Sequence, residues 1–185
     1  MNKNISRFGI LALLSVSIFS GCKKDKGETN DEEIITTMIL KLTPANGGAP
    51  VTFQLDDPDG PGGSTPVTDE IHLSPSTTYA VEVQLLNKTS SLIEDITTEV
   101  AEENIAHRFY YQTTANITVS NLDTDDNGVP LGIHSTWITG AAGTGQMTVT
   151  LRHYPGEPPG KATDDLVNSA KSGTDITATF NTVIQ

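Results

Sequence analysis

Three potential metal-ligating side chains recur every four residues near the middle of the chain. Glu99, Glu103 and His107 would form one stripe if this segment is helical, because residues four apart share a helix face. Carboxylate oxygens and an imidazole nitrogen are ligands for zinc or another divalent ion. The stripe therefore predicts a metal site completed by His153, His134 or His72 from elsewhere in the chain. The alternative is the solvated face of an amphipathic helix.

A second pattern is the D-x-D-x-N-G sequence formed by Asp123, Asp125, Asn127 and the following glycine. It matches the opening half of a calcium loop, in which alternate residues direct oxygen ligands inward around a sharp bend. A full EF-hand would need a glutamate at the twelfth loop position, where this chain has His134, and helices on both sides. An EF-hand is thus excluded. A Ca²⁺ site in a β-loop and a plain hairpin turn both remain open.

Motifs of the common enzyme classes are missing from the sequence. It contains no Walker lysine, no H-E-x-x-H and no G-x-S-x-G. The glycine-rich run Gly140 to Gly145 precedes a predicted strand, whereas a dinucleotide-binding loop precedes a helix. We therefore expect no catalytic residues and no enzymatic activity.

The N-terminal segment has the order of an export signal. Lys3 and Arg7 precede an apolar run over residues 8–19, and a Ser-Gly pair stands directly before Cys22, the only cysteine. The run is shorter than the roughly 20 residues that a membrane-spanning helix needs. The Ser-Gly-Cys sequence resembles the lipobox of bacterial lipoproteins. This resemblance implies removal of residues 1–21 and lipidation of Cys22, which would anchor the protein to a membrane.

The charge balance is strongly acidic. The chain has 23 Asp and Glu against 11 Lys and Arg, a formal charge of −12, and loss of Lys3 and Arg7 with the signal makes it −14. Such a surface repels phosphate backbones, so nucleic acid is excluded as a partner.

A single cysteine also excludes an internal disulfide.

The rest of the chain predicts one β-rich domain. Residues 23–33 contain no apolar side chain, so residues 22–33 are predicted to be the lipidated cysteine and a flexible tether, and residues 34–185 a single domain. Short β-rich runs with alternating apolar residues, separated by Gly, Pro, Asn and Asp, predict an all-β antiparallel sandwich of immunoglobulin-like or related topology. One short helix is expected over residues 96–107, capped by Asp95. The predicted strands span residues 34–42, 51–55, 70–73, 79–85, 108–113, 116–122, 134–139, 146–152 and 176–183.

Several segments together resemble a family of small Bacteroidota outer-membrane lipoproteins. They are Cys22-Lys23-Lys24-Asp25, the loop from Asp56 to Gly63, the run from Glu102 to Tyr110 that contains His107, and the segment from Thr139 to His153. The resemblance implies an outer-membrane location, on the periplasmic or cell-surface face, and a TonB-dependent receptor or other outer-membrane protein as partner. It brings no catalytic residue. Such proteins sometimes carry the label of a type 1 periplasmic-binding fold, whose two α/β lobes need a longer, alternating chain than this one.

These observations together predict a lipid-anchored, non-enzymatic binding or accessory protein of the outer membrane that serves nutrient or metal uptake. The cofactor expected from the acidic motifs is Ca²⁺ or another divalent metal ion. The alternative is a structural or adhesive cell-surface module without a small-molecule ligand.

Overall fold

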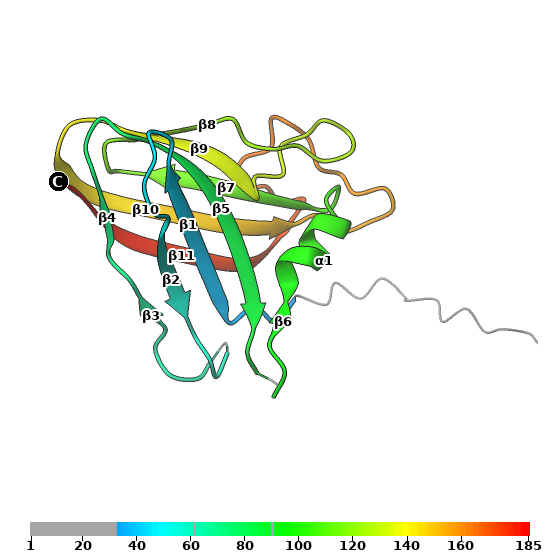
Figure 1. Ribbon diagram of the computed structural model, residues 1–185. Helices are drawn as coiled ribbons and strands as arrows, with labels where there is room; N and C mark the ends of the chain where they lie inside the picture. The colour runs from blue at the N-terminus through cyan, green and yellow to red at the C-terminus, as the bar shows by residue number, and fades with distance from the viewer. Residues whose placement is uncertain (1–32, 61, 90) are drawn as a thin grey trace, which may run out of the picture.

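The computed structural model describes residues 33–60, 62–89 and 91–185. Two β-sheets pack face to face as a sandwich, with one short helix at one end (Figure 1). The predicted fold class is therefore confirmed. The predicted signal peptide over residues 1–21, the lipidation site Cys22 and the tether up to residue 32 lie outside the described residues. Among the described residues, no helix has the length and apolarity needed to cross a membrane.

The larger sheet has seven strands, and its central strand is the first one after the predicted tether. Its strands follow the order β3-β2-β1-β5-β9-β8, with β6 paired to β5, and every pairing in it is antiparallel. The strands are β1 (Thr37–Pro44), β2 (Val51–Asp56), β3 (Val67–Thr68), β5 (Thr78–Asn87), β6 (Glu94–Asp95), β8 (Ile117–Ser120) and β9 (His134–Thr139).

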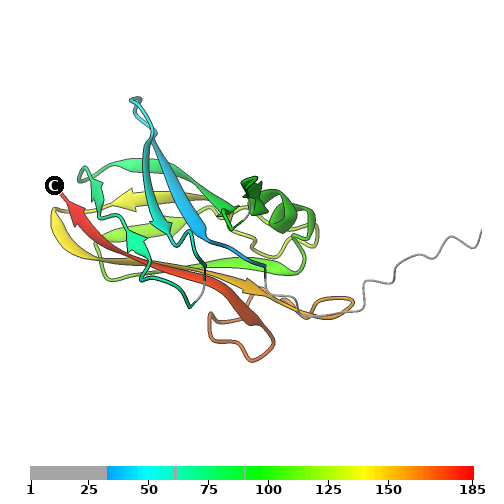
Figure 2. The same ribbon diagram turned by 90° about the horizontal axis from the view of Figure 1, so that it is seen from below.

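The smaller sheet has four strands in the order β4-β11-β10-β7. Its strands are β4 (Ile71–Leu73), β7 (His107–Thr113), β10 (Gly143–His153) and β11 (Gly173–Ile184). β4 and β11 pair in parallel, so this sheet is mixed and not wholly antiparallel as the sequence predicts. β4 enters this sheet from β3 of the larger sheet and is not joined to β11 by a hairpin, so no tight turn imposes an antiparallel pairing on the two strands. Figure 2 shows the two sheets as separate layers.

The core fills the space between the sheets with the apolar face of each strand. In β5 the alternation is complete, since Tyr79, Val81, Val83 and Leu85 are buried and the residues between them are exposed. Trp137 of β9 is fully buried, and its indole N–H donates to the Ser135 hydroxyl at 3.1 Å. Burying one large apolar side chain stabilises the fold by about 1.5–3 kcal/mol. The alternation seen in the sequence therefore places these stabilising side chains in the core.

The helix is shorter than the sequence predicts. α1 spans Ile96–Glu102, begins where the Asp95 carboxylate accepts the Thr97 N–H at 3.0 Å, and buries Ile96 and Val100. The predicted helix continues to residue 107, but there the chain has already turned into β7. Pairing of β7 with β10 satisfies the backbone of this segment in a strand and buries Phe109. The turn after α1 is the element that positions the candidate site.

Candidate metal centre

His107 is the centre of the candidate site. It is the first residue of β7, and its side chain is fully buried. Its Nδ1 atom lies 3.2 Å from the backbone oxygen of Glu103, so an N–H at this position donates to that carbonyl. Burial lowers the pKa of His107 to about 4, which keeps the ring neutral at pH 7. A neutral imidazole whose Nδ1–H is held by a carbonyl presents its Nε2 lone pair, the usual arrangement of a metal-ligating histidine.

Two carboxyl groups lie close to this imidazole. Glu33 Oε1 lies 3.4 Å from His107 Nε2, and one donor atom each from Glu33, Glu103 and His107 all lie within 4.8 Å of one another. Ligand atoms about 2.0–2.2 Å from one ion are at most about 4 Å apart, so small side-chain movements would close the set around a cation. His107 Nε2 and Glu33 Oε2 are buried without a hydrogen-bond partner among the described residues.

The protonation of Glu33 reflects the same surroundings. Its side chain is only 11% exposed. Burial, followed by the negative charges of Glu99, Asp175 and Glu103, raises its pKa to about 8. With His107 also neutral at pH 7, their 3.4 Å contact is not an ion pair. A bound cation would favour the ionised carboxylate, because an opposite charge at close range stabilises the charged form.

Lys161 holds the segment that carries the site. Its ammonium donates to the backbone oxygens of Asn104 and His107, each at 2.7 Å. It also forms an ion pair with Asp125 Oδ2 at 2.7 Å, with both side chains only 1% exposed. The turn from α1 to β7 is therefore fixed to the loop after β8 and to the loop between β10 and β11. Figure 1 shows α1 and the loop between β10 and β11 at the same end of the sandwich.

The ring of His153 supports the imidazole from one side. His153 of β10 is directly opposite His107 of β7 in the strand register, and their rings stack with centroids 4.8 Å apart. The sequence suggests His153, His134 or His72 as additional ligands. His153 stacks on the ring instead of joining the three converging donor atoms. His134 pairs with Asp123, and His72 pairs with Glu70.

The predicted stripe is only partly brought together. Glu103 and His107 converge, but they do so through the turn after α1 and not along one helix face. Glu99 is exposed and is not among the three converging residues. Glu33, which composition places in the predicted tether, is the residue that sequence reasoning missed. Neither its neighbours nor its spacing signals a ligand, because only the folded chain brings it to His107.

The predicted calcium loop uses its carboxylates within the fold. Asp125 Oδ1 accepts the backbone N–H groups of Asn127 and Val129, both at 2.8 Å. Burial would raise the pKa of Asp125, but the hydrogen bond and charge of Lys161 and the backbone N–H groups of Val129 and Asn127 together outweigh it. They hold this pKa below its usual value. Asp123 Oδ1 accepts the N–H groups of Gly132 and His134. The Lys161 ammonium thus already supplies a positive charge at Asp125, and Ca²⁺ binding by Asp123, Asp125 and Asn127 stays a prediction.

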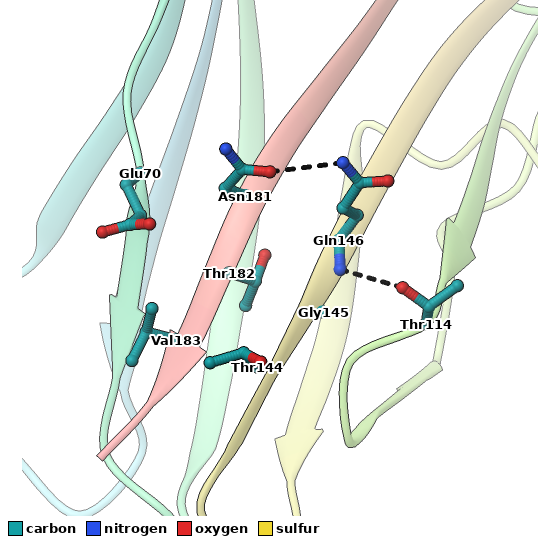
Figure 3. A pocket seen from close by; sticks show the side chains of 8 residues that line it. All are labelled: Glu70, Thr114, Thr144, Gly145, Gln146, Asn181, Thr182 and Val183. Atoms are coloured by element: carbon teal, nitrogen blue, oxygen red, sulfur yellow. Dashed lines mark hydrogen bonds between the residues drawn. The ribbon is translucent and has the colours of Figure 1, made fainter.

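A polar hollow of about 370 Å³ lies on the smaller sheet, at the opposite end of β10 and β11 from His153. In Figure 3 the side chains of Gln146 and Asn181 face each other across the two strands, with a 3.2 Å hydrogen bond between them. Its one ionisable lining residue, Glu70, is paired with His72. The hollow offers hydroxyl and amide groups and no reactive group. Its lining residues are Glu70, Thr114, Thr144, Gly145, Gln146, Asn181, Thr182 and Val183.

Comparison with known proteins identifies no relative: no protein-family model, no curated protein and no solved structure matches the chain.

Proposed function

We propose that this chain is a lipid-anchored, non-enzymatic binding protein of the outer membrane that holds a divalent metal ion, as an accessory of nutrient or metal uptake. Glu33, Glu103 and His107 are its ligands. The observation that carries the proposal is the buried Nε2 atom of His107, which has no hydrogen-bond partner among the described residues and lies 3.4 Å from Glu33 Oε1. Donor atoms of Glu33, Glu103 and His107 all lie within 4.8 Å of one another. A buried polar atom without a partner is costly, and a metal ion removes this cost.

The position of Glu33 supports the link to a membrane. Only residues 23–32 separate Glu33 from the predicted lipidation site Cys22. An extended chain covers at most about 3.3–3.6 Å per residue, so the metal centre would stand no further than roughly 40 Å from the lipid surface. That distance suits contact with a neighbouring membrane protein, such as a TonB-dependent receptor.

The first test measures metal content and affinity in the full chain, purified from membranes in detergent. We expect about one equivalent of a divalent metal by elemental analysis. Chelation should lower the melting temperature, because a ligand that binds only the folded state stabilises it. Glu103→Gln and His107→Gln should each weaken binding by about tenfold or more. Glu102→Gln is the matched control, since Glu102 is an exposed residue of the same helix that is neither one of the converging residues nor one of the charges that act on Glu33. This variant should bind as the parent does.

Two results would contradict the metal proposal. One is a metal-free protein whose melting temperature does not change when Zn²⁺, Mn²⁺ or Ca²⁺ is added, which would favour the structural or adhesive alternative. The other is a Glu103→Gln variant that binds as tightly as the parent.

The anchor has a separate test in Cys22→Ser. This variant lacks the thiol that would be acylated, and we expect it in the soluble fraction of cell lysates while the parent stays with the membranes. A parent chain that is soluble from the start would remove the anchor from the proposal and leave the metal site untouched.

A further inference from the structure

β11 contains a bulge at Asp175. Along the ladder with β10, Leu151 pairs with Ile176, but the next residue, Arg152, pairs with Thr174. Asp175 is therefore the extra residue, without a place in the register. A bulge re-aims a side chain relative to the regular alternation of a strand, and bulges are enriched beside functional sites.

The bulge turns Asp175 toward the metal centre. Its side chain is only 1% exposed, and its Oδ2 atom lies 4.0 Å from His107 Nε2. The charge of Asp175 is also one of the causes that raise the pKa of Glu33, so Asp175 is near both residues. β10 lies between β11 and β7 in the sheet. The side chain of Asp175 nevertheless comes within 4.0 Å of His107 on β7, and both side chains are buried.

We propose that Asp175 is a fourth protein ligand of this centre and that the completed set, one imidazole and three carboxylates, selects a first-row transition-metal ion such as Zn²⁺ or Mn²⁺ over Ca²⁺ and Mg²⁺. The proposal rests on the proposed function, because it completes the same site. Imidazole nitrogen is a good ligand for transition metals, whereas Ca²⁺ and Mg²⁺ prefer an all-oxygen shell.

The four ligands come from three well-separated parts of the chain. Glu33 precedes β1, Glu103 and His107 flank the turn from α1 to β7, and Asp175 belongs to the last strand. An ion bound by all four residues would therefore link the segment before β1 to strands β7 and β11 of the smaller sheet.

The experiment compares variants of the full chain in detergent by titration with Zn²⁺, Mn²⁺ and Ca²⁺. Asp175→Asn keeps the shape of the side chain and removes its charge, and we expect it to weaken Zn²⁺ binding by about tenfold or more. The control is Asp164→Asn, which removes an exposed aspartate and should leave the affinity unchanged. Ca²⁺ at the same concentrations should compete poorly with Zn²⁺ on the parent protein.

Folding of each variant is checked in the presence of chelator by the fluorescence of Trp137. If Asp175→Asn does not fold, the titration uses Asp175→Ser, a smaller neutral residue for which we expect the same loss of affinity.

Distinct outcomes separate the two proposals. If His107→Gln abolishes Zn²⁺ binding while the folded Asp175 variant binds as the parent does, the fourth ligand is overturned and the metal function stands. If Ca²⁺ binds the parent as tightly as Zn²⁺, the selectivity is overturned. A parent protein that binds none of the three ions overturns both proposals.

Discussion

Replacement of Lys161 by methionine is expected to be among the most destabilising single changes in this protein. The ammonium of Lys161 has three acceptors, namely Asp125 Oδ2 and the backbone oxygens of Asn104 and His107, each at 2.7 Å. Methionine fills the space of the aliphatic stem but leaves the Asp125 carboxylate buried without its counter-charge. Removing one partner of a buried ion pair costs about 3–5 kcal/mol. For a domain of this size that loss lowers the melting temperature by roughly 6–20 °C.

The assay is urea unfolding followed by fluorescence, since Trp137 is the single tryptophan and is fully buried. A double-mutant cycle isolates the pair: Asp125→Asn removes the carboxylate charge and keeps an oxygen that accepts the N–H groups of Asn127 and Val129. The double variant should therefore be more stable than Lys161→Met alone, with a coupling of about 1–3 kcal/mol. A loss below about 1 kcal/mol for Lys161→Met, or no coupling with Asp125, would refute the argument that this amine compensates a buried charge.

Two further predictions concern other parts of the sandwich. A Cβ on Gly145 would clash with the backbone nitrogen of Ala115, so Gly145→Ala should cost about 1–3 kcal/mol in the same urea assay. A Cβ on Gly143 would meet nothing within 4 Å, so Gly143→Ala should change the midpoint little, and equal effects of the two changes would contradict the steric reasoning. The hydrogen bond from Lys88 holds the pKa of Asp56 below its usual 3.8. This stabilisation is complete above pH 3.8 and is lost as the pH falls through the folded value. The Asp56→Asn variant should therefore be less stable than the parent by at most about 1 kcal/mol at pH 7, and the two proteins should be equally stable in strong acid. A stability difference that grows as the pH falls would contradict this pH dependence.

The strands could be predicted from the sequence because their signal is local. Alternation in β5 and β10 reports directly which side chains face the core, and all nine predicted strands correspond to observed ones. The sequence does not predict the two-residue strands β3 and β6, since two residues carry no periodicity. It predicts the start of the helix correctly, because the Asp95 cap is a local signal. It places the end of the helix wrongly, because the pairing of β7 with β10 is a contact between distant segments.

The candidate site could be predicted only where its residues are close in sequence. The spacing of Glu103 and His107 correctly marks a pair that converges, although a turn and not a helix brings the two together. Glu33 lies in a stretch whose composition indicates a tether, so nothing local marks it as a ligand. Asp175 is turned inward by a one-residue bulge, which regular strand periodicity does not reveal. The position of a bulge depends on the register between two strands. The residues of one strand alone do not reveal that register, because it is set by pairing with a distant segment.

The central position of β1 determines how the domain responds to a pulling force. β1 begins at Thr37, shortly after Glu33, and is hydrogen-bonded to β2 on one side and to β5 on the other. The C-terminus lies at the opposite end of the sandwich from the start of β1 (Figure 1). Tension applied between these two ends runs along the strand and therefore across its hydrogen bonds, which are perpendicular to it. Both ladders then bear the load in shear, with many bonds strained at once and none peeled off singly. A domain tethered through its first strand in this way resists extraction far better than one tethered through an edge strand.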